Sequence, residues 1–426
     1  MSFIKNIVNS NLFKVTSLNS VSILIKILVG FVTSKVIAIF IGPSGMALVG
    51  NLRNFMSSIE ALSTLGFENG VVKYVSENKS DEAKLRITLS TVFYTVLISC
   101  LFVSLSLLIF SDYFNAKIFG NLNYQYLIKS LIIVLPFYIG NIFLVAVING
   151  LGNYKKVISI NILGTIIGLI VTVLLITQFQ VSGALFSIVI TPSLLFFVSF
   201  YNINKELNIF KFVSLKEVKF LELKNFSSFT IMALVSSVFG PIVFLAIRNH
   251  IIGDLGIDVA GYWEAMSRIS SYYFLFITSI LGIYFLPKLS SSKSYKETNG
   301  LIISYFKTVL PLFVFGLIVV FIFKDILIQL VFSKDFSPMN KLFLWQMIGD
   351  VLKAASYILA FQFYAKKMTK AFVTFELLSL AVLYFSSIYF ISIYQIEGVV
   401  IAHAFTYLIY FGALVIYFRK NLFIKK

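Results

Sequence analysis

Charged residues are scarce in this chain of 426 residues. Asp, Glu, Lys and Arg make up 12% of it, hydrophobic residues make up 59%, and the mean hydropathy is +0.94. A soluble globular domain is about 25% charged, so this composition excludes a water-soluble globule. Acidic residues are the scarcer sign, with 18 Asp and Glu against 35 Lys and Arg. In a membrane protein such an excess arises because Lys and Arg collect in cytoplasmic loops, and we expect no nucleic-acid partner.

Cysteine and histidine are also nearly absent. The single cysteine, Cys100, excludes a disulfide framework and a cysteine-based metal site. The two histidines, His250 and His403, are far apart in sequence. We therefore expect no metal, no cofactor and no catalytic triad. The first apolar run is too long for a signal peptide and no A-x-A-like cleavage site follows it, so we interpret the N-terminus as a retained cytoplasmic tail.

Apolar segments recur along the whole chain, with short polar breaks between them. Each is close to the roughly 20 residues that a helix needs to cross a bilayer. The sequence therefore predicts an all-α integral membrane protein with about 12 spans. The predicted spans cover residues 17–41, 47–72, 88–110, 126–149, 157–178, 182–201, 226–250, 259–286, 302–323, 341–364, 369–392 and 397–420.

The basic residues predict the orientation of these spans. With the N-terminus in the cytoplasm, nearly all loop Lys and Arg residues fall on the cytoplasmic side. The exceptions are Lys117, Lys324, Lys334 and Lys341. By the positive-inside rule, both termini are expected in the cytoplasm, and the span count is expected to be even.

The longest polar stretch, residues 202–225, lies at the midpoint of the chain. It is basic and mildly amphipathic, which is typical of a segment on the cytoplasmic membrane surface. We interpret it as a linker between an N-terminal lobe, residues 1–201, and a C-terminal lobe, residues 226–426. Helix breakers add one local expectation, because Gly240-Pro241 inside the seventh span predicts a kink.

A matched spacing indicates that the two lobes are related. Arg53 and Lys73 are separated by 20 residues at the second span of the first lobe and its exit. Arg268 and Lys288 have the same separation at the second span of the other lobe. A parallel duplication about an axis along the membrane normal produces this pattern.

Charges inside the second span are especially informative. A charge at the bilayer centre costs about 2.5–3.5 kcal/mol on insertion scales, so such residues normally face a cavity or a partner. Glu60 follows Arg53 by seven residues and lies nearly in line with it on a helix, with Glu68 about 60° away. We expect this face to line an aqueous cavity; the alternative is an internal salt bridge that only locks helices together.

The eighth and tenth spans carry two further charged pairs. Glu264 and Arg268 are at i, i+4, and Asp350 and Lys353 are at i, i+3, which are spacings for pairing within one helix. Pairing that neutralises these charges is the alternative to a role in lining a cavity. The basic residues expected on the walls of a cavity between the lobes are Lys26, Arg53, Arg248 and Arg268. Because guanidinium groups bind phosphate through charge-assisted hydrogen bonds, we expect an anionic, phosphate-bearing cargo.

Three stretches resemble sequences of a known family. They are GPSGMALVGNLRNFMSSIEALSTLGFENGVVKYVSE (42–77), GYWEAMSRISSYYFLFITSILGIYFLPKLS (261–290) and LFLWQMIGDVLKAASYI (342–358). They resemble the second, eighth and tenth spans of Wzx-type flippases for O-antigen and enterobacterial common antigen, within the multidrug/oligosaccharidyl-lipid/polysaccharide exporter superfamily. The matching positions are Asn51, Arg53, Asn69, Gly70, Lys73, Arg248, Trp263, Arg268, Asp350 and Lys353.

The resemblance implies two six-helix lobes around a central cavity in the bacterial inner membrane. It implies translocation of an undecaprenyl-pyrophosphate-linked oligosaccharide, an O-antigen or related surface-glycan unit, to the periplasmic leaflet by alternating access and without catalysis. Membrane lipids and a glycan polymerase are the other partners to consider. Neither Glu60 nor Glu68 belongs to the family pattern, so the choice of H⁺ or Na⁺ as a coupling ion stays open.

The expected site residues combine these matches with the intramembrane charges. Those expected to contact substrate are Lys26, Asn51, Arg53, Arg248, Trp263, Arg268 and Lys353. Those expected to carry a coupling ion or to balance charge are Glu60, Glu68, Glu264 and Asp350.

Two other functions remain open. One is an ion-coupled small-molecule exporter of the same architecture, although a basic cavity argues against cationic drugs. The other is a membrane glycan polymerase or acyltransferase, although the predicted external loops are short.

Overall fold

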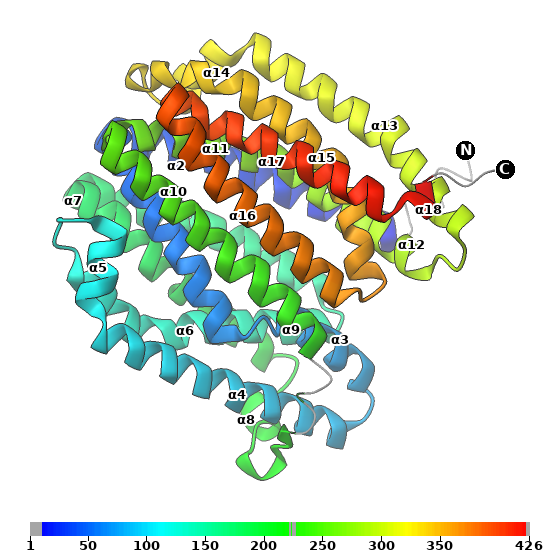
Figure 1. Ribbon diagram of the computed structural model, residues 1–426. Helices are drawn as coiled ribbons and strands as arrows, with labels where there is room; N and C mark the ends of the chain where they lie inside the picture. The colour runs from blue at the N-terminus through cyan, green and yellow to red at the C-terminus, as the bar shows by residue number, and fades with distance from the viewer. Residues whose placement is uncertain (1–10, 221–222, 224–226, 423–426) are drawn as a thin grey trace. The chain divides into compact units, whose positions relative to one another are not determined.

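The structure is a computed structural model that describes residues 11–220, 223 and 227–422, and the described part is helical without strands (Figure 1). Ten of its helices are long and apolar enough to cross a membrane. The helices of the first half are α2 (Asn11–Thr64), α3 (Glu68–Asn78), α4 (Glu82–Ile109), α5 (Ser111–Phe119), α6 (Gln125–Gly150), α7 (Tyr154–Asn204), α8 (Ile209–Phe212), and η1 (Leu215–Glu217). Those of the second half are α9 (Ser227–Leu234), η3 (Val235–Phe239), α10 (Gly240–Leu255), α11 (Ile257–Ile280), η4 (Leu281–Phe285), α12 (Leu286–Ser291), α13 (Tyr295–Ile322), α14 (Lys324–Val331), η5 (Lys334–Leu342), α15 (Phe343–Ala365), α16 (Thr369–Tyr394), α17 (Ile396–Tyr417), and α18 (Arg419–Leu422). The prediction of an all-α integral membrane fold is confirmed.

Two of the helices, α2 and α7, are long enough for two crossings each. A helix of 51 residues such as α7 would be roughly 77 Å long if straight, against about 30 Å of hydrocarbon. Each helix contains one residue with non-helical dihedral angles, Gly42 in α2 (φ 62°) and Gln180 in α7 (φ 49°). The ten helices therefore accommodate the twelve predicted spans.

The turn inside α7 recurs between α16 and α17. Gln180 and Gln395 both have positive φ, and each is followed three residues later by a glycine. A Cβ at Gly183 would lie 1.9 Å from the carbonyl oxygen of Leu175, and Gly398 is crowded in the same way. These glycines let two antiparallel helices approach closely.

This repeated turn supports the predicted duplication. Gln180 and Gln395 are 215 residues apart, as are Arg53 and Arg268. The positive-φ turn residue before α7, Gly152, has its counterpart before α16 at the same offset, in Lys367. One register therefore relates the two halves of the chain.

The chain forms two compact units. Unit 1 comprises Met1–Val36 and Asn51–Val238, and unit 2 comprises Ile37–Gly50 and Phe239–Lys426. This division differs from the expected lobes in two places, because residues 37–50 of α2 belong to unit 2 and residues 227–238, expected in the C-terminal lobe, belong to unit 1. Close packing explains the first difference, since a Cβ at Gly261 would lie 2.0 Å from the carbonyl oxygen of Pro43.

Within unit 1, α6 packs against α3, α4 and α7 (Figure 1). The expected linker also belongs to this unit, because the Ser90 hydroxyl donates to the carbonyl of Phe212 and accepts from the backbone N–H of Ser214. The linker thus packs on α4. Residues 221–222 and 224–226 of the linker lie outside the described residues.

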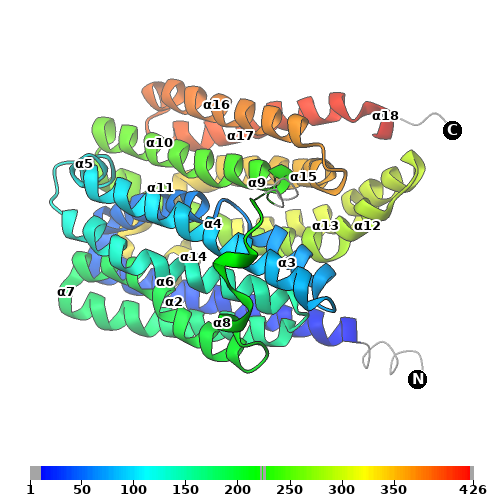
Figure 2. The same ribbon diagram turned by 90° about the horizontal axis from the view of Figure 1, so that it is seen from below.

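Within unit 2, α17 packs against both α15 and α16, and α16 and α17 lie side by side in Figure 2. The irregularity predicted at Gly240-Pro241 takes the form of five residues of π-helix, η3, that directly precede Gly240. Proline provides no backbone N–H, so Pro241 begins the following α-helix in its first turn.

Candidate functional site

Three charged side chains of unit 2 form a buried cluster, which we call the charged triad. Glu264 of α11 lies between Arg248 of α10 and Arg268 of α11. The Arg248 Nη2 donates to Glu264 Oε2 at 2.6 Å, and the Arg268 Nε donates to Oε1 at 3.0 Å. These residues are 1%, 6% and 4% exposed for Arg248, Glu264 and Arg268, respectively. The i, i+4 pairing of Glu264 with Arg268, given above as the alternative to a role in lining a cavity, is present.

The triad is tightly enclosed by its neighbours in unit 2. A Cβ at Gly50 would lie 2.4 Å from Glu264 Oε2 and 2.9 Å from Arg248 Cζ, so a side chain there would displace the paired carboxylate and guanidinium. The Trp263 ring lies 5.2 Å from the Arg248 guanidinium carbon and stacks on Phe244 with an interplanar angle of 2°. Arg248 and Trp263 are therefore held in place by contacts within the unit.

Two guanidinium donors of the triad are left over. The Nη1 and Nη2 atoms of Arg268 are buried, and no acceptor among the described residues lies within hydrogen-bonding distance of them. Two arginines against one glutamate also leave the cluster with a net positive charge. Buried donors without partners in a positive environment are suited to bind an anionic oxygen.

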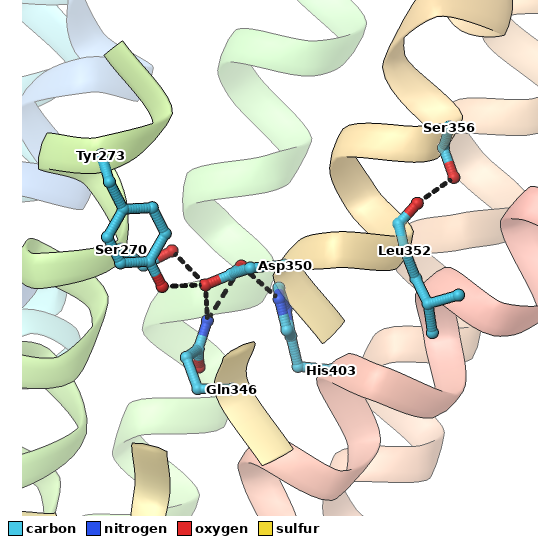
Figure 3. Close-up of polar contacts among 7 residues, drawn as sticks. All are labelled: Ser270, Tyr273, Gln346, Asp350, Leu352, Ser356 and His403. Carbon is cyan, nitrogen blue, oxygen red and sulfur yellow. Dashed lines mark hydrogen bonds and ion pairs between the residues drawn. The ribbon is translucent and has the colours of Figure 1, made fainter. Parts of the chain in front are cut away.

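A second buried cluster surrounds Asp350 of α15 (Figure 3). Its carboxylate accepts hydrogen bonds from Ser270 at 2.8 Å and from the Tyr273 hydroxyl, both on α11. Gln346, one turn earlier on α15, donates at 3.2 Å, and His403 Nε2 of α17 lies 2.9 Å from Oδ1. This Asp350 cluster joins three helices through one fully buried carboxylate.

The connections in the Asp350 cluster differ from those of a nucleophilic site. In a site with a nucleophilic serine, the serine hydroxyl donates a hydrogen bond to a histidine, and an acidic residue holds that histidine in its orientation. Here the Ser270 hydroxyl and the His403 ring both bind Asp350 instead. The cluster therefore provides structure and charge rather than an activated serine.

Lys353 forms no salt bridge with Asp350, although the two groups, whose i, i+3 pairing was the alternative to lining a cavity, do interact electrostatically. Its Nζ lies over aromatic rings, the nearest being Phe274, with the centroid at 4.6 Å. The reason is that His403, from another helix, binds the carboxylate that Lys353 would have bound.

The predicted site residues of unit 1 are more dispersed. Asn51 is fully buried and its Nδ2 donates to the carbonyl of Ile118 at 2.9 Å, which joins α2 to the end of α5. Lys26, Arg53 and Glu68 are exposed within the chain, whereas the half-buried Glu60 accepts a hydrogen bond from Tyr138 of α6. Substrate contacts by these residues stay a prediction.

A pocket in unit 1 and the acidic, histidine and cysteine residues were compared with what a phosphate or a metal ion needs. An apolar pocket of about 240 Å³ in unit 1 is lined by Phe93, Val96, Leu97, Cys100, Pro136, Phe137, Ile139, Gly140, Phe143 and Phe196. It has no charged lining and does not suit a phosphate. In the described part of the chain, no group of three or more His, Cys, Asp or Glu residues could hold a metal ion.

Sequence reasoning missed several residues that complete these clusters, including Ser270 and Gln346 beside Asp350. His403 and Tyr273 bind Asp350 from other helices, and Gly50 makes room for the triad. An intramembrane histidine is a weak signal that was available for His403. Nothing in the local sequence around Tyr273 or Gly50 indicates their partners.

Comparisons with known proteins give a consistent result. Residues 12–293 match a family model described as polysaccharide biosynthesis protein. The chain is 27% identical over 404 residues to the lipid III flippase of Escherichia coli (strain K12), covering 94% of this chain and 97% of that protein.

Two solved structures are similar in fold. One is a multidrug resistance MATE family transporter of the MOP superfamily in an inward-facing conformation, with a TM-score of 0.78, 13% identity and 93% and 95% of the two chains covered. The other is the lipid II flippase MurJ in an inward closed conformation, with a TM-score of 0.70, 17% identity and 95% and 88% covered. At these identities they show the fold alone, and this agrees with a two-lobe transporter.

Proposed function

Because the chain belongs to the polysaccharide biosynthesis protein family, we propose that it is a flippase for a lipid-linked oligosaccharide. Its cargo is an undecaprenyl-pyrophosphate-linked glycan unit, which it moves from the cytoplasmic to the periplasmic leaflet of the bacterial inner membrane by alternating access. The observation that carries the proposal is the similarity to a lipid III flippase over nearly the whole of both chains.

The chemistry of the cargo explains why a protein is needed. An isolated ion costs tens of kcal/mol to bury in a medium of low dielectric constant, so a pyrophosphate does not cross the hydrocarbon unaided. Guanidinium groups replace its hydration shell with charge-assisted hydrogen bonds. Arg268 offers two buried donors for this purpose, and Arg53 is exposed at the equivalent position of the other half.

We assign the remaining predicted residues by their environment. Lys26 is exposed and supplements the basic charge that attracts the phosphates. Arg248, Trp263 and Asn51 are held by neighbours within their own units and position the site rather than contact the sugar.

The acidic residues divide in the same way. Glu264 balances the charge of two arginines, and four donors surround Asp350. The half-buried Glu60 and the exposed Glu68 have fewer charge partners and are the better candidates to take up a coupling cation, H⁺ or Na⁺. Flipping under an imposed pH or sodium gradient, compared between the parent and Glu60→Gln, tests this assignment.

We also propose that both termini lie in the cytoplasm, because nearly all loop Lys and Arg residues then fall on the cytoplasmic side. Fusions of a reporter that is active only in the periplasm to Lys117 and to Lys156 test it. Activity is expected at Lys117 alone, and the reverse result would invert the topology.

Flipping in reconstituted vesicles tests the function directly. A fluorescent undecaprenyl-pyrophosphate oligosaccharide in the outer leaflet is quenched by a membrane-impermeant reductant, and protein-dependent protection reports translocation. We expect Arg268→Ala and Arg53→Ala to lose most of the activity. The matched control is Arg86→Ala, because Arg86 is an exposed arginine paired with Glu82 on the surface of α4.

The outcome also separates the alternatives. A parent protein that gives no translocation of the labelled glycan lipid, but exports organic cations, would replace the flippase by a small-molecule exporter. Undiminished flipping by both arginine variants would remove these guanidinium groups from the binding site.

A further inference from the structure

Three aromatic side chains of unit 2 surround the amino group of Lys353. Its Nζ lies 4.6 Å from the ring centroid of Phe274, 5.5 Å from that of Tyr407 and 5.8 Å from that of Tyr357. All three distances are within the roughly 6 Å over which a cation is attracted to an aromatic ring. Tyr357, the most distant of the three, also makes a side-chain hydrogen bond with Lys353. We call these three rings the aromatic cage.

The cage is assembled by tertiary structure. Phe274 comes from α11, Tyr357 from α15 and Tyr407 from α17. Phe274 and Tyr357 contact each other with centroids 5.7 Å apart, and the His403 ring packs against Tyr407 at 4.9 Å. The rings are therefore fixed by their neighbours before any ligand is considered.

The electrostatic surroundings also favour a cation. Asp350 and Glu376 both interact electrostatically with Lys353. Lys353, Tyr357 and Tyr407 are each intermediate in exposure, and Phe274 is buried. Clustered aromatic rings around a cation are the feature by which proteins recognise alkylammonium ions.

We propose that the aromatic cage is a binding site for organic ammonium ions and that Lys353 occupies it as a tethered ligand. The lysine thereby prevents free organic cations from using this site. Lys353 would then be a specificity-determining residue, which adds to the proposed function a means of excluding organic cations from this site.

Lys353→Ala tests the proposal because it empties the cage with little other change. The atoms removed are three carbons and one nitrogen, which n-propylammonium reproduces. Binding is measured on purified full-length protein in detergent, by calorimetry with n-propylammonium and, as the neutral analogue of equal size, 1-propanol. We expect Lys353→Ala to bind n-propylammonium at least about tenfold more tightly than the parent, about 1.4 kcal/mol, and to gain nothing for 1-propanol.

Two variants serve as matched controls. Lys353→Met fills the cage with a neutral chain of similar length and should show no gain. Lys353→Ala combined with Tyr407→Leu lacks one ring and should lose at least about fivefold of the gained affinity. Equal binding by the parent, an equal gain for 1-propanol, or a gain that survives Tyr407→Leu would each overturn the proposal.

Poor folding of Lys353→Ala does not remove the test. The protein is then produced with n-propylammonium or with 1-propanol in the medium and the lysis buffer. Recovery of monodisperse protein with the amine alone supports the cage, and equal recovery or none with both overturns it. These measurements involve no lipid-linked sugar, so they succeed or fail independently of the flippase assay.

Discussion

Replacing Glu264 by glutamine tests how the charged triad contributes to stability. The substitution removes one negative charge and leaves the Arg248 and Arg268 guanidinium groups buried beside each other. The glutamine oxygen can accept from one arginine, but its amide group then directs hydrogens at the other. Breaking a buried ion pair by removing one partner typically costs about 3–5 kcal/mol, because the remaining charge stays buried.

The same substitution at the surface provides the control. Glu82 pairs with Arg86 at 2.8 Å, with the same i, i+4 spacing as Glu264 and Arg268. In contrast to Glu264 and Arg268, the side chains of Glu82 and Arg86 are both exposed. Exposed pairs of this kind contribute about 0.3–0.5 kcal/mol. Glu264→Gln is therefore expected to lower the free energy of unfolding by several times more than Glu82→Gln does.

Thermal unfolding followed by tryptophan fluorescence measures the difference. One of the two tryptophans, Trp263, lies against Arg248, and a Trp345→Phe background leaves it as the sole reporter. Adding Arg248→Met to Glu264→Gln should recover part of the loss, because a single buried guanidinium then remains. The reasoning is refuted if Glu264→Gln is no worse than Glu82→Gln, or if the second substitution recovers nothing.

Three further predictions follow from other contacts. Gly50→Ala should destabilise the protein by about 1–3 kcal/mol, because its Cβ would overlap the triad carboxylate; an unchanged melting temperature would contradict this. Asp350→Asn should destabilise the protein by roughly 2–4 kcal/mol, because it replaces one acceptor oxygen by a donor amide among four donors. His403→Ala should destabilise it by less, because the three other hydrogen bonds of Asp350 remain. Thermal unfolding of both variants should give this order. A hydrogen bond from Lys156 at 2.5 Å lowers the pKa of Glu206, so the stability from this pair is present above about pH 5 and is lost as the pH falls through the lowered pKa. Because both side chains are partly exposed, at 29% and 35%, solvent screens the pair, and Lys156→Ala should cost under about 1 kcal/mol at neutral pH and nothing in acid. A loss independent of pH would refute the assignment.

Much of the fold could be predicted from sequence because hydropathy is a local property. The apolar runs located the spans, and the two double-length helices α2 and α7 each contain two of them. The assignment of residues 37–50 to unit 2 could not be predicted, because it depends on the close approach of Gly261 to Pro43 from a distant helix.

In the candidate site, contacts within one helix could be predicted from sequence, whereas contacts between helices could not. The pairing of Glu264 with Arg268 lies within one helix and follows from its i, i+4 spacing. The hydrogen-bond partner His403 could not be predicted for Asp350, because it is 53 residues away in sequence and reaches the carboxylate only through the packing of α15 on α17. Spacing identifies neighbours on a helix, but it does not rank them against groups that tertiary structure brings closer.

The internal repeat separates what is shared by the two halves from what is particular to each. Turns and an arginine recur at a common offset of 215 residues, so Arg53 and Arg268 occupy equivalent helix positions. The surrounding charges do not recur, because the position equivalent to Glu264 is Val49. Arg268 is consequently buried against a carboxylate that has no counterpart at the equivalent position beside Arg53, which is exposed. The duplicated scaffold therefore places two guanidinium groups of the same origin in different electrostatic surroundings, so Arg53→Ala and Arg268→Ala need not affect flipping equally.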